Sequence, residues 1–371
     1  MRRLLSLALL AAAVFGSDAE AAVRVYRPDD PSQVVLKLEK VRAEHIADGS
    51  DPGAVVRQVD ALVDAGARSG NERYYGYAEQ VLQSAGDARD REIAIRRARL
   101  LQHKHEFAQA ERVLGDILRL DARDREARLM RAQVRLHLHE PQRALADCTA
   151  LMPLVDLLTS TTCIAQARAA LGDLQHAQTL LLGVLDFQRG DDATRSWSAG
   201  VAAEFATRLG DTNAAGRWYR EAFELDPRSH YARITYADWL LSAGRFDEAL
   251  QVAGRGQSLA DRARIVLAGR DRGSVEAQRL QLAWQEADAR GERAHLRDRA
   301  RFELTLLHDP AKASASARAS LQDRNEADDA LILAAAAAST RDRQALQTVR
   351  AWQQRYRYED VRLESLLGAV R

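Results

Sequence analysis

Five alanines at nearly constant spacing constrain this chain more than any other feature of its sequence. Ala110, Ala144, Ala177, Ala215 and Ala249 recur with a period of about 34 residues, and only the interval before Ala215 is clearly longer. A period of about 34 residues is typical of arrays of antiparallel helix pairs, in which each pair stacks on its neighbours. The sequence therefore predicts an all-α chain, folded as a right-handed superhelical solenoid with degenerate repeats at both ends.

Glycines mark the expected turn inside three of these repeats. Gly172, Gly210 and Gly244 each stand shortly before one of the alanines, at the same distance in every case. Glycine ends helices because it adopts positive φ at little steric cost. The run 225–227, Leu-Asp-Pro, closes the second helix of one repeat, since proline cannot continue a helix. With these residues the sequence resembles the tetratricopeptide repeat family, and the expected member is a protein that bacteria export.

The expected organisation follows from the repeat and from the first residues. Residues 1–21 combine a basic start, a short apolar run and small residues at the expected cleavage point, as a signal peptide does. Lead-in helices are expected over 22–70, the tetratricopeptide-like array over 71–263, and divergent helical repeats over 264–371. The chain is thus expected to be periplasmic or otherwise associated with the cell envelope, with no transmembrane segment after signal removal.

Charge composition argues against nucleic acid as a partner. The chain has 54 Lys and Arg residues against 53 Asp and Glu residues, and its formal net charge is +1. A balanced chain lacks the basic excess that attracts a phosphate backbone. The segment 352–358 mixes arginines with aromatic residues, but an exported chain rarely meets nucleic acid. The expected partner is a protein or peptide.

The family resemblance also implies a binding surface. In tetratricopeptide proteins the first helices of the pairs line a concave groove, which holds the partner. Transferring the groove positions to this sequence gives a mixed polar and aromatic set: Arg96, Arg99, His103, Gln133, His137, Gln166, Trp197, Glu204, Tyr231 and Asp238. The alternative for each of them is a contact with a neighbouring repeat or a side chain in solvent.

The two cysteines fall on helices that a solenoid brings together. Cys148 belongs to the second helix of one repeat and Cys163 to the first helix of the next. An oxidising compartment favours a disulfide between such residues. The alternative is a pair of small buried thiols in an alanine-rich core.

Two histidine pairs occupy equivalent positions in consecutive repeats. His103 and His105 lie one repeat length before His137 and His139. Neutral imidazoles brought together can bind zinc or copper, so a metal- or small-ligand-binding protein is the alternative function. Histidines near helix C-termini are also common without any metal, because the helix dipole favours them there.

The sequence contains no motif that predicts catalysis. It has no phosphate-binding Gly-x-x-x-x-Gly-Lys-Ser/Thr loop, no His-Glu-x-x-His helix and no Gly-x-Ser-x-Gly elbow. No catalytic residue, resident metal or other cofactor is therefore expected. The sequence favours a non-enzymatic interaction scaffold or assembly factor of the bacterial cell envelope.

Overall fold

The computed structural model describes residues 51–69, 73–85, 90–187, 191–256, 258–293 and 295–368. The expected signal peptide (1–21) and residues 22–50 of the lead-in lie outside these ranges. Within them every regular element is a helix, which confirms the all-α prediction. The helices are α3 (Pro52–Ser69), α4 (Arg73–Ser84), α5 (Arg91–His103), α6 (Phe107–Leu120), α7 (Arg125–His137), α8 (Pro141–Leu151), α9 (Leu157–Ala170), α10 (Leu174–Leu185), α11 (Asp192–Leu209), α12 (Thr212–Leu225), α13 (His230–Ser242), α14 (Phe246–Ala253), α15 (Leu259–Gly269), α16 (Val275–Ala289), α17 (Leu296–Thr305), α18 (Pro310–Arg324), α19 (Ala327–Thr340), α20 (Arg343–Tyr356) and α21 (Val361–Gly368).

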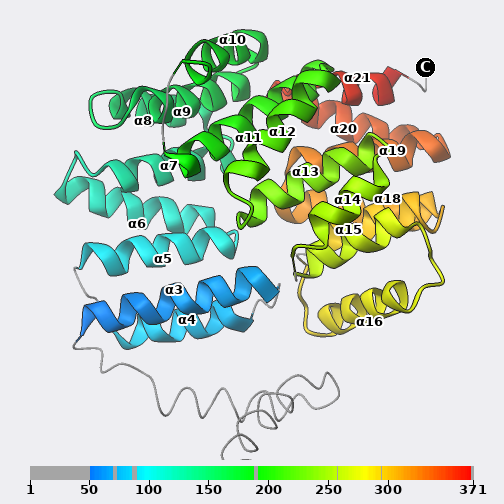
Figure 1. The fold of residues 1–371 in the computed structure, drawn as a ribbon, viewed down its shortest axis with the longest axis horizontal. Coiled ribbons are helices and arrows are strands. Elements are labelled where there is room, and N and C mark those ends of the chain that lie inside the picture. Colours follow the sequence, from blue (N-terminus) through cyan, green and yellow to red (C-terminus); the bar gives the residue numbers. More distant parts are fainter. Residues whose placement is uncertain are drawn as a thin grey trace, which may run out of the picture.

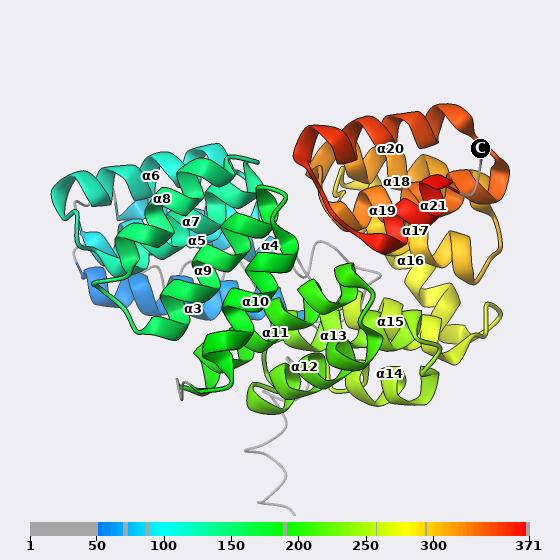
Figure 2. The same ribbon diagram turned by 90° about the horizontal axis from the view of Figure 1, so that it is seen from above.

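The helices stack in pairs to form a curved solenoid (Figure 1). Each odd-numbered helix packs against the even-numbered helix that follows it, and from α7 onward each odd-numbered helix also contacts the next odd-numbered one. Seen from above, α3–α10 and α16–α21 form two arms joined through α11–α15 (Figure 2). From α7 onward the odd-numbered helices therefore make a continuous layer of the stack.

Helices pair on both sides of the limits expected for the array. The expected boundary at 70/71 falls between α3 and α4, which share a buried cluster that includes Val59 and Leu82. The boundary at 263/264 falls inside α15. Among the described residues no helix is both long and apolar enough to cross a bilayer.

The five periodic alanines pack where their small size is needed. Each is fully buried on an even-numbered helix, at the contact with the preceding odd-numbered helix. A larger side chain at such a position would force the two helices apart, because protein interiors are close-packed. The spacing therefore identified the helix pairs correctly.

Aspartate caps fix where several odd-numbered helices begin. Asp90, Asp124, Asp156 and Asp191 precede α5, α7, α9 and α11, and each carboxylate accepts a hydrogen bond from a backbone N–H in the first turn. Such a cap satisfies donors that have no partner inside the helix and stabilises it by about 1 kcal/mol. One cap per pair repeats the helix start along this part of the array.

A left-handed residue closes the turn inside each pair from α5–α6 to α19–α20. Glycine fills this position at Gly172, Gly210 and Gly244, as the sequence predicted. Larger residues fill it elsewhere, with φ between 54° and 58°: His105, His139, Arg270, His308 and Arg341. The second histidine of each repeated pair thus replaces the turn glycine in the two turns that precede Gly172.

The disulfide expected from the sequence is present. Cys148 on α8 is bonded to Cys163 on α9, and both residues are fully buried. Around them lies a cluster of small apolar residues that includes Ala132, Ala144 and Ala167. The bond therefore joins two consecutive helix pairs through their shared core.

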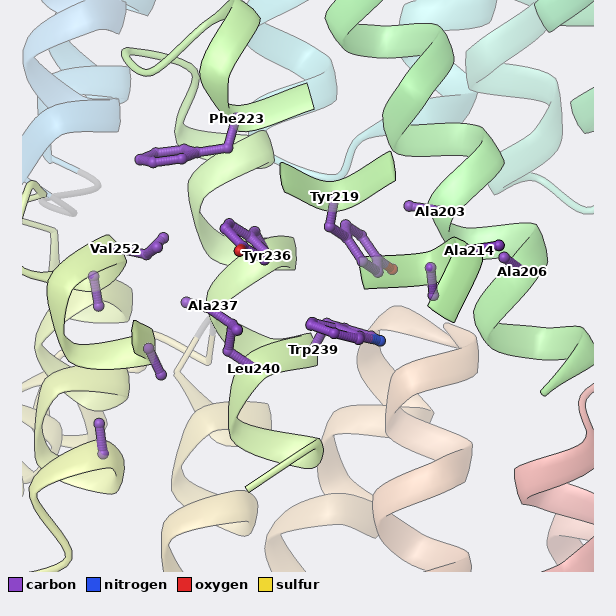
Figure 3. Packing of buried hydrophobic residues seen from close by; sticks show 14 residues of the cluster. Ala203, Ala206, Ala214, Tyr219, Phe223, Tyr236, Ala237, Trp239, Leu240 and Val252 are labelled. Atoms are coloured by element: carbon purple, nitrogen blue, oxygen red, sulfur yellow. The ribbon is translucent and has the colours of Figure 1, made fainter. Parts of the chain in front are cut away.

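Aromatic residues fill the core at the centre of the stack (Figure 3). The ring of Trp239 on α13 lies 6.2 Å from the rings of Tyr219 and Tyr236. A Cβ atom at Gly216 on α12 would lie 2.5 Å from this indole. Gly216 therefore gives Trp239 the room to reach the helix pair before it.

The solenoid curves far enough for its end to contact its middle. Arg208 on α11 donates a hydrogen bond from Nε to the backbone oxygen of Glu359, over 3.0 Å. His139, at the α7–α8 turn, stacks on Tyr356 with 3.8 Å between ring centroids. Helix α21 accordingly lies beside α11 (Figure 1).

The turn glycine Gly172 should be less replaceable than Gly244. Alanine at either position requires left-handed backbone, at about 1–2 kcal/mol. At Gly172 the new Cβ would also lie 3.1 Å from Cβ of Arg357, whereas nothing lies within 4 Å at Gly244. We expect urea unfolding to show Gly172→Ala about 1–3 kcal/mol less stable than Gly244→Ala. Equal losses would contradict the contact between the α9–α10 turn and the C-terminal segment.

Candidate functional site

A cavity of about 1510 Å³ lies inside the curve of the solenoid. One wall is made by α11, α13 and α15, and the other by α17, α19 and α21. Its charged lining residues are Glu204, Asp238, Asp271, Glu326 and Asp328, together with Arg264, Arg270, Arg272, Arg297, Arg301 and Arg362. Acidic and basic side chains are therefore almost balanced in number.

Asp238 is the centre of an ion-pair network that joins three successive inner helices. Arg264 on α15 donates to both carboxylate oxygens of Asp238 on α13, over 2.9 and 2.7 Å. Arg264 also contacts Asp298 on α17 at 2.6 Å, and Arg301 on the same helix contacts Asp238. Burial alone would raise the pKa of Asp238, but the guanidinium groups of Arg264 and Arg301 outweigh it and bring the pKa to about 2.

The low pKa of Asp238 gives stability with a defined pH dependence. Its ordinary pKa is about 3.9, so the unfolded chain binds a proton at higher pH than the folded chain. The stabilisation is complete above about pH 4 and is lost as pH falls towards 2, by about 2 kcal/mol. We expect Asp238→Asn to remove this part of the pH dependence, as urea unfolding measured between pH 5 and pH 2 should show. An unchanged slope would mean that Asp238 titrates normally.

A second network anchors α19 to α17. Asp329 is fully buried and accepts hydrogen bonds from Arg297 over 2.7 and 3.0 Å and from Ser320 over 2.9 Å. Arg297 also pairs with Glu326, whose carboxylate lies 4.0 Å from the ring of His137 on α7. Burial would raise the pKa of Glu326, but Arg297 keeps it below its ordinary value. These contacts hold the second wall of the cavity in place.

Three polar groups in the cavity are partly exposed, although Glu204 also pairs with Arg208 and Asp328 with Arg297. The side chain of Glu204 on α11 is 40% exposed, that of Asp328 on α19 is 55% exposed, and Tyr231 on α13 is 54% exposed. The cavity walls raise the pKa of Glu204 through burial, and Asp328 raises it further against the opposing effect of Arg208. The pKa of Tyr231 is also raised, first by burial and then by Glu204. The three groups therefore form a partly desolvated polar surface beside the apolar residues of the same cavity.

Only part of the predicted groove lines this cavity. Of the ten residues inferred from the family resemblance, His137, Glu204, Tyr231 and Asp238 do so. The cavity residues that the prediction missed include Arg264 on α15 and the C-terminal residues Arg297, Arg301, Asp328, Tyr358 and Arg362. The sequence feature that lies nearest to these missed residues in the chain is the mixture of arginine and aromatic residues near 355–358.

The other predicted groove residues contact neighbouring helices. Arg96 pairs with Asp60 and Arg99 with Glu126. Gln133 donates to Gln166 over 3.0 Å. His103 stacks on Tyr75. Trp197 packs against the buried residues of α9–α11. These side chains connect pairs along the array.

The four paired histidines contact aromatic rings. His105 and His137 both contact Phe107, at 5.4 and 4.5 Å between ring centroids. His103 and His139 stack on tyrosines. No group of three or more potential metal ligands occurs among the residues that the structure describes. The histidines therefore have structural contacts, and nothing in the described chain favours the metal-binding alternative.

Comparison with known proteins finds similarity in solved structures alone. No protein-family model and no curated protein sequence matches the chain. A tetratricopeptide repeat protein from Parabacteroides merdae is 11% identical over 76% of this chain and 99% of its own, with a TM-score of 0.39. A chain of the APC/C hetero-tetramer Cut9–Hcn1 is 12% identical over 82% of this chain and 52% of its own, with a TM-score of 0.43. A signal transduction ATPase with a tetratricopeptide repeat sensor from Pyrococcus horikoshii is 11% identical over 97% of this chain and 56% of its own, with a TM-score of 0.38.

Proposed function

We propose that this chain is a non-enzymatic interaction scaffold or assembly factor that holds a segment of a partner protein in its central cavity. The observation that carries the proposal is the cavity of about 1510 Å³, with Tyr231, Glu204 and Asp328 exposed inside it. Small-molecule pockets have volumes of about 300–1,000 Å³. The cavity therefore suits a polypeptide segment better than a small metabolite.

The combination of groups also suits a peptide. An exposed tyrosine offers contact area and a hydroxyl group at low cost in conformational entropy, and such residues are frequent where proteins bind one another. Glu204 and Asp328 provide acceptors for backbone N–H groups or for basic side chains. Neither the cavity nor the sequence motifs suggest a reaction, so the proposal includes no catalytic step.

We place this function in the bacterial cell envelope. The buried Cys148–Cys163 disulfide supports this location, because disulfides persist in oxidising compartments. The signal-peptide pattern of residues 1–21 supports it independently. A fusion of residues 1–50 to alkaline phosphatase, which is active only after export, tests the location. An inactive fusion that accumulates in the cytoplasm would contradict it.

Site-specific photo-cross-linking tests the cavity. A benzophenone amino acid at Tyr231 would place the reactive group inside the cavity, and the same amino acid at Leu282 would place it on the exposed side of α16. In envelope extract of the source cell we expect a discrete protein adduct from position 231 and none from position 282. Adduct formation should also weaken in a Glu204→Ala/Asp328→Ala background. Identical adducts from both positions, or none from 231, would contradict the proposal.

A further inference from the structure

A short C-terminal segment crosses the turns of three consecutive helix pairs. The segment is Tyr356–Val361, and residues 357–360 of it are non-helical. The surface beneath it, here called the turn ridge, consists of His139, Gly172, Leu174, Arg208 and Gly210. The two parts are distant in the chain and meet only because the solenoid curves.

The first contact of the segment is aromatic. The ring of His139 stacks on Tyr356, and Nε2 of His139 lies 3.0 Å from Nδ2 of Asn325. Trp352 donates from Nε1 to Oδ1 of Asn325, which fixes the orientation of the amide because indole nitrogen is donor-only. Nδ2 of Asn325 therefore donates to the hydroxyl oxygen of Tyr356, and Nε2 of His139 lies within hydrogen-bond distance of both Nδ2 and the backbone oxygen of Asn325. The start of the segment is therefore held by the ring of His139 and by the side chain of Asn325.

The next contact caps a helix from a distant part of the chain. Asp173 stands at the N-cap of α10 but makes no side-chain capping bond. Instead, the carboxylate of Glu359 accepts from the backbone N–H of Leu174 over 2.8 Å. Negative charge is favourable at a helix N-terminus. Turn residue Gly172 permits this approach, since a Cβ there would lie 3.1 Å from Cβ of Arg357.

Arg208 contacts the segment at two points. Its side chain is 5% exposed, its guanidinium lies 4.2 Å from the ring centroid of Tyr358, and its Nε donates to the backbone oxygen of Glu359. A buried cation over an aromatic face is attracted to it. Its Nη2 is buried and has no hydrogen-bond partner among the described residues. The internal segment thus leaves one donor of the turn ridge unsatisfied.

We propose that the turn ridge is a peptide-binding surface, which the chain's own residues 356–361 occupy in cis. The partner segment that fits it carries aromatic residues at alternate positions followed by an acidic residue, and it turns through a left-handed residue between the two aromatic ones, as Arg357 does. A partner with this chemistry must displace the C-terminal segment, and a further acceptor opposite Nη2 of Arg208 would give it an advantage over that segment. This surface adjoins the cavity, since Arg208 pairs with Glu204 at 3.4 Å and Tyr358 lines the cavity, but the two proposals have separate readouts: cross-linking from position 231 and peptide binding to the ridge.

The test uses a fluorescent synthetic peptide of residues 354–363 and the full-length chain. Tyr356→Ala/Glu359→Ala in the chain removes two cis contacts and leaves the turn ridge unchanged. We expect the peptide to bind this released chain at least about tenfold more tightly than it binds the wild type. Arg208→Ala in the released chain should weaken binding about tenfold again. A peptide carrying the same two alanines is the control and should bind neither chain.

Two further measurements, of folding and of a single variant, distinguish a loss of peptide binding from a loss of folding. Circular dichroism verifies that each variant is folded. If the double variant unfolds, Glu359→Ala alone changes an exposed side chain and should still increase peptide binding several-fold. Equal binding by folded wild-type and released chains, or binding that is insensitive to Arg208→Ala, would overturn the proposal. Cross-linking from position 231 does not depend on either outcome.

Discussion

Replacing Arg264 by leucine is expected to lower the free energy of unfolding by about 3–5 kcal/mol. The Arg264 side chain is 4% exposed and neutralises Asp238 on α13 and Asp298 on α17. Without the guanidinium, Asp298 loses its ion pair and Asp238 keeps only Arg301. The partly buried carboxylate of Asp298 then lacks a cation, and that of Asp238 is compensated by one guanidinium instead of two. Urea unfolding at pH 7, followed by circular dichroism, measures the loss.

Arg262→Leu is the matched control on the same helix. Arg262 pairs with Glu276 over 2.7 Å, but the two side chains are 32% and 37% exposed. Ion pairs this accessible contribute about 0–1 kcal/mol, because water and salt screen them. A loss for Arg264→Leu no larger than that for Arg262→Leu would show that the Asp238 network does not hold the inner helices together.

Opening the disulfide is expected to lower the free energy of unfolding by about 3 kcal/mol. The bond closes a loop with a sequence separation of 15, and this restricts the unfolded chain. Both cysteines are buried between α8 and α9, so the folded packing changes little when the bond is reduced. Urea unfolding with and without reductant, after refolding under each condition, measures the difference.

A Cys148→Ala/Cys163→Ala variant controls for direct effects of the reductant. Its unfolding midpoint should be the same in both conditions. Thiol titration of the denatured wild type should find two thiols with reductant and none without it. If the wild-type midpoint is unchanged although both thiols are free, the bond contributes nothing to stability.

Local features of the fold could be predicted from the sequence, because each depends on residues that are near one another in the chain. Ala110 and its equivalents mark the close contact within a pair, and Gly172, Gly210 and Gly244 mark left-handed turns. The same logic was incomplete at His105 and His139. With His103 and His137 they were candidates for the alternative of metal binding, and in the structure both occupy the left-handed turn position that glycine takes in later pairs. A residue with a side chain can adopt this conformation at some energetic cost, so residue type alone does not identify it.

The candidate site was predictable mainly on the wall made by α11, α13 and α15. Glu204, Tyr231 and Asp238 on this wall, and His137 on α7, were implied by the family resemblance, and the structure places all four on the cavity. The opposite wall comes from residues far along the chain, such as Arg301, which contacts Asp238 across 63 positions. No periodic pattern indicates which of these distant residues face one another.

By itself the sequence determined the helical pairs, their small-residue contacts and the cysteines that join two of them, because each depends on residues within about one repeat. Only the tertiary structure decided that the solenoid closes on itself. Curvature is the sum of small rotations between successive pairs, and each rotation depends on how whole side chains pack. That sum brings Glu359 to the N-terminus of α10 and encloses the cavity. The position of the candidate site is therefore a property of the complete stack.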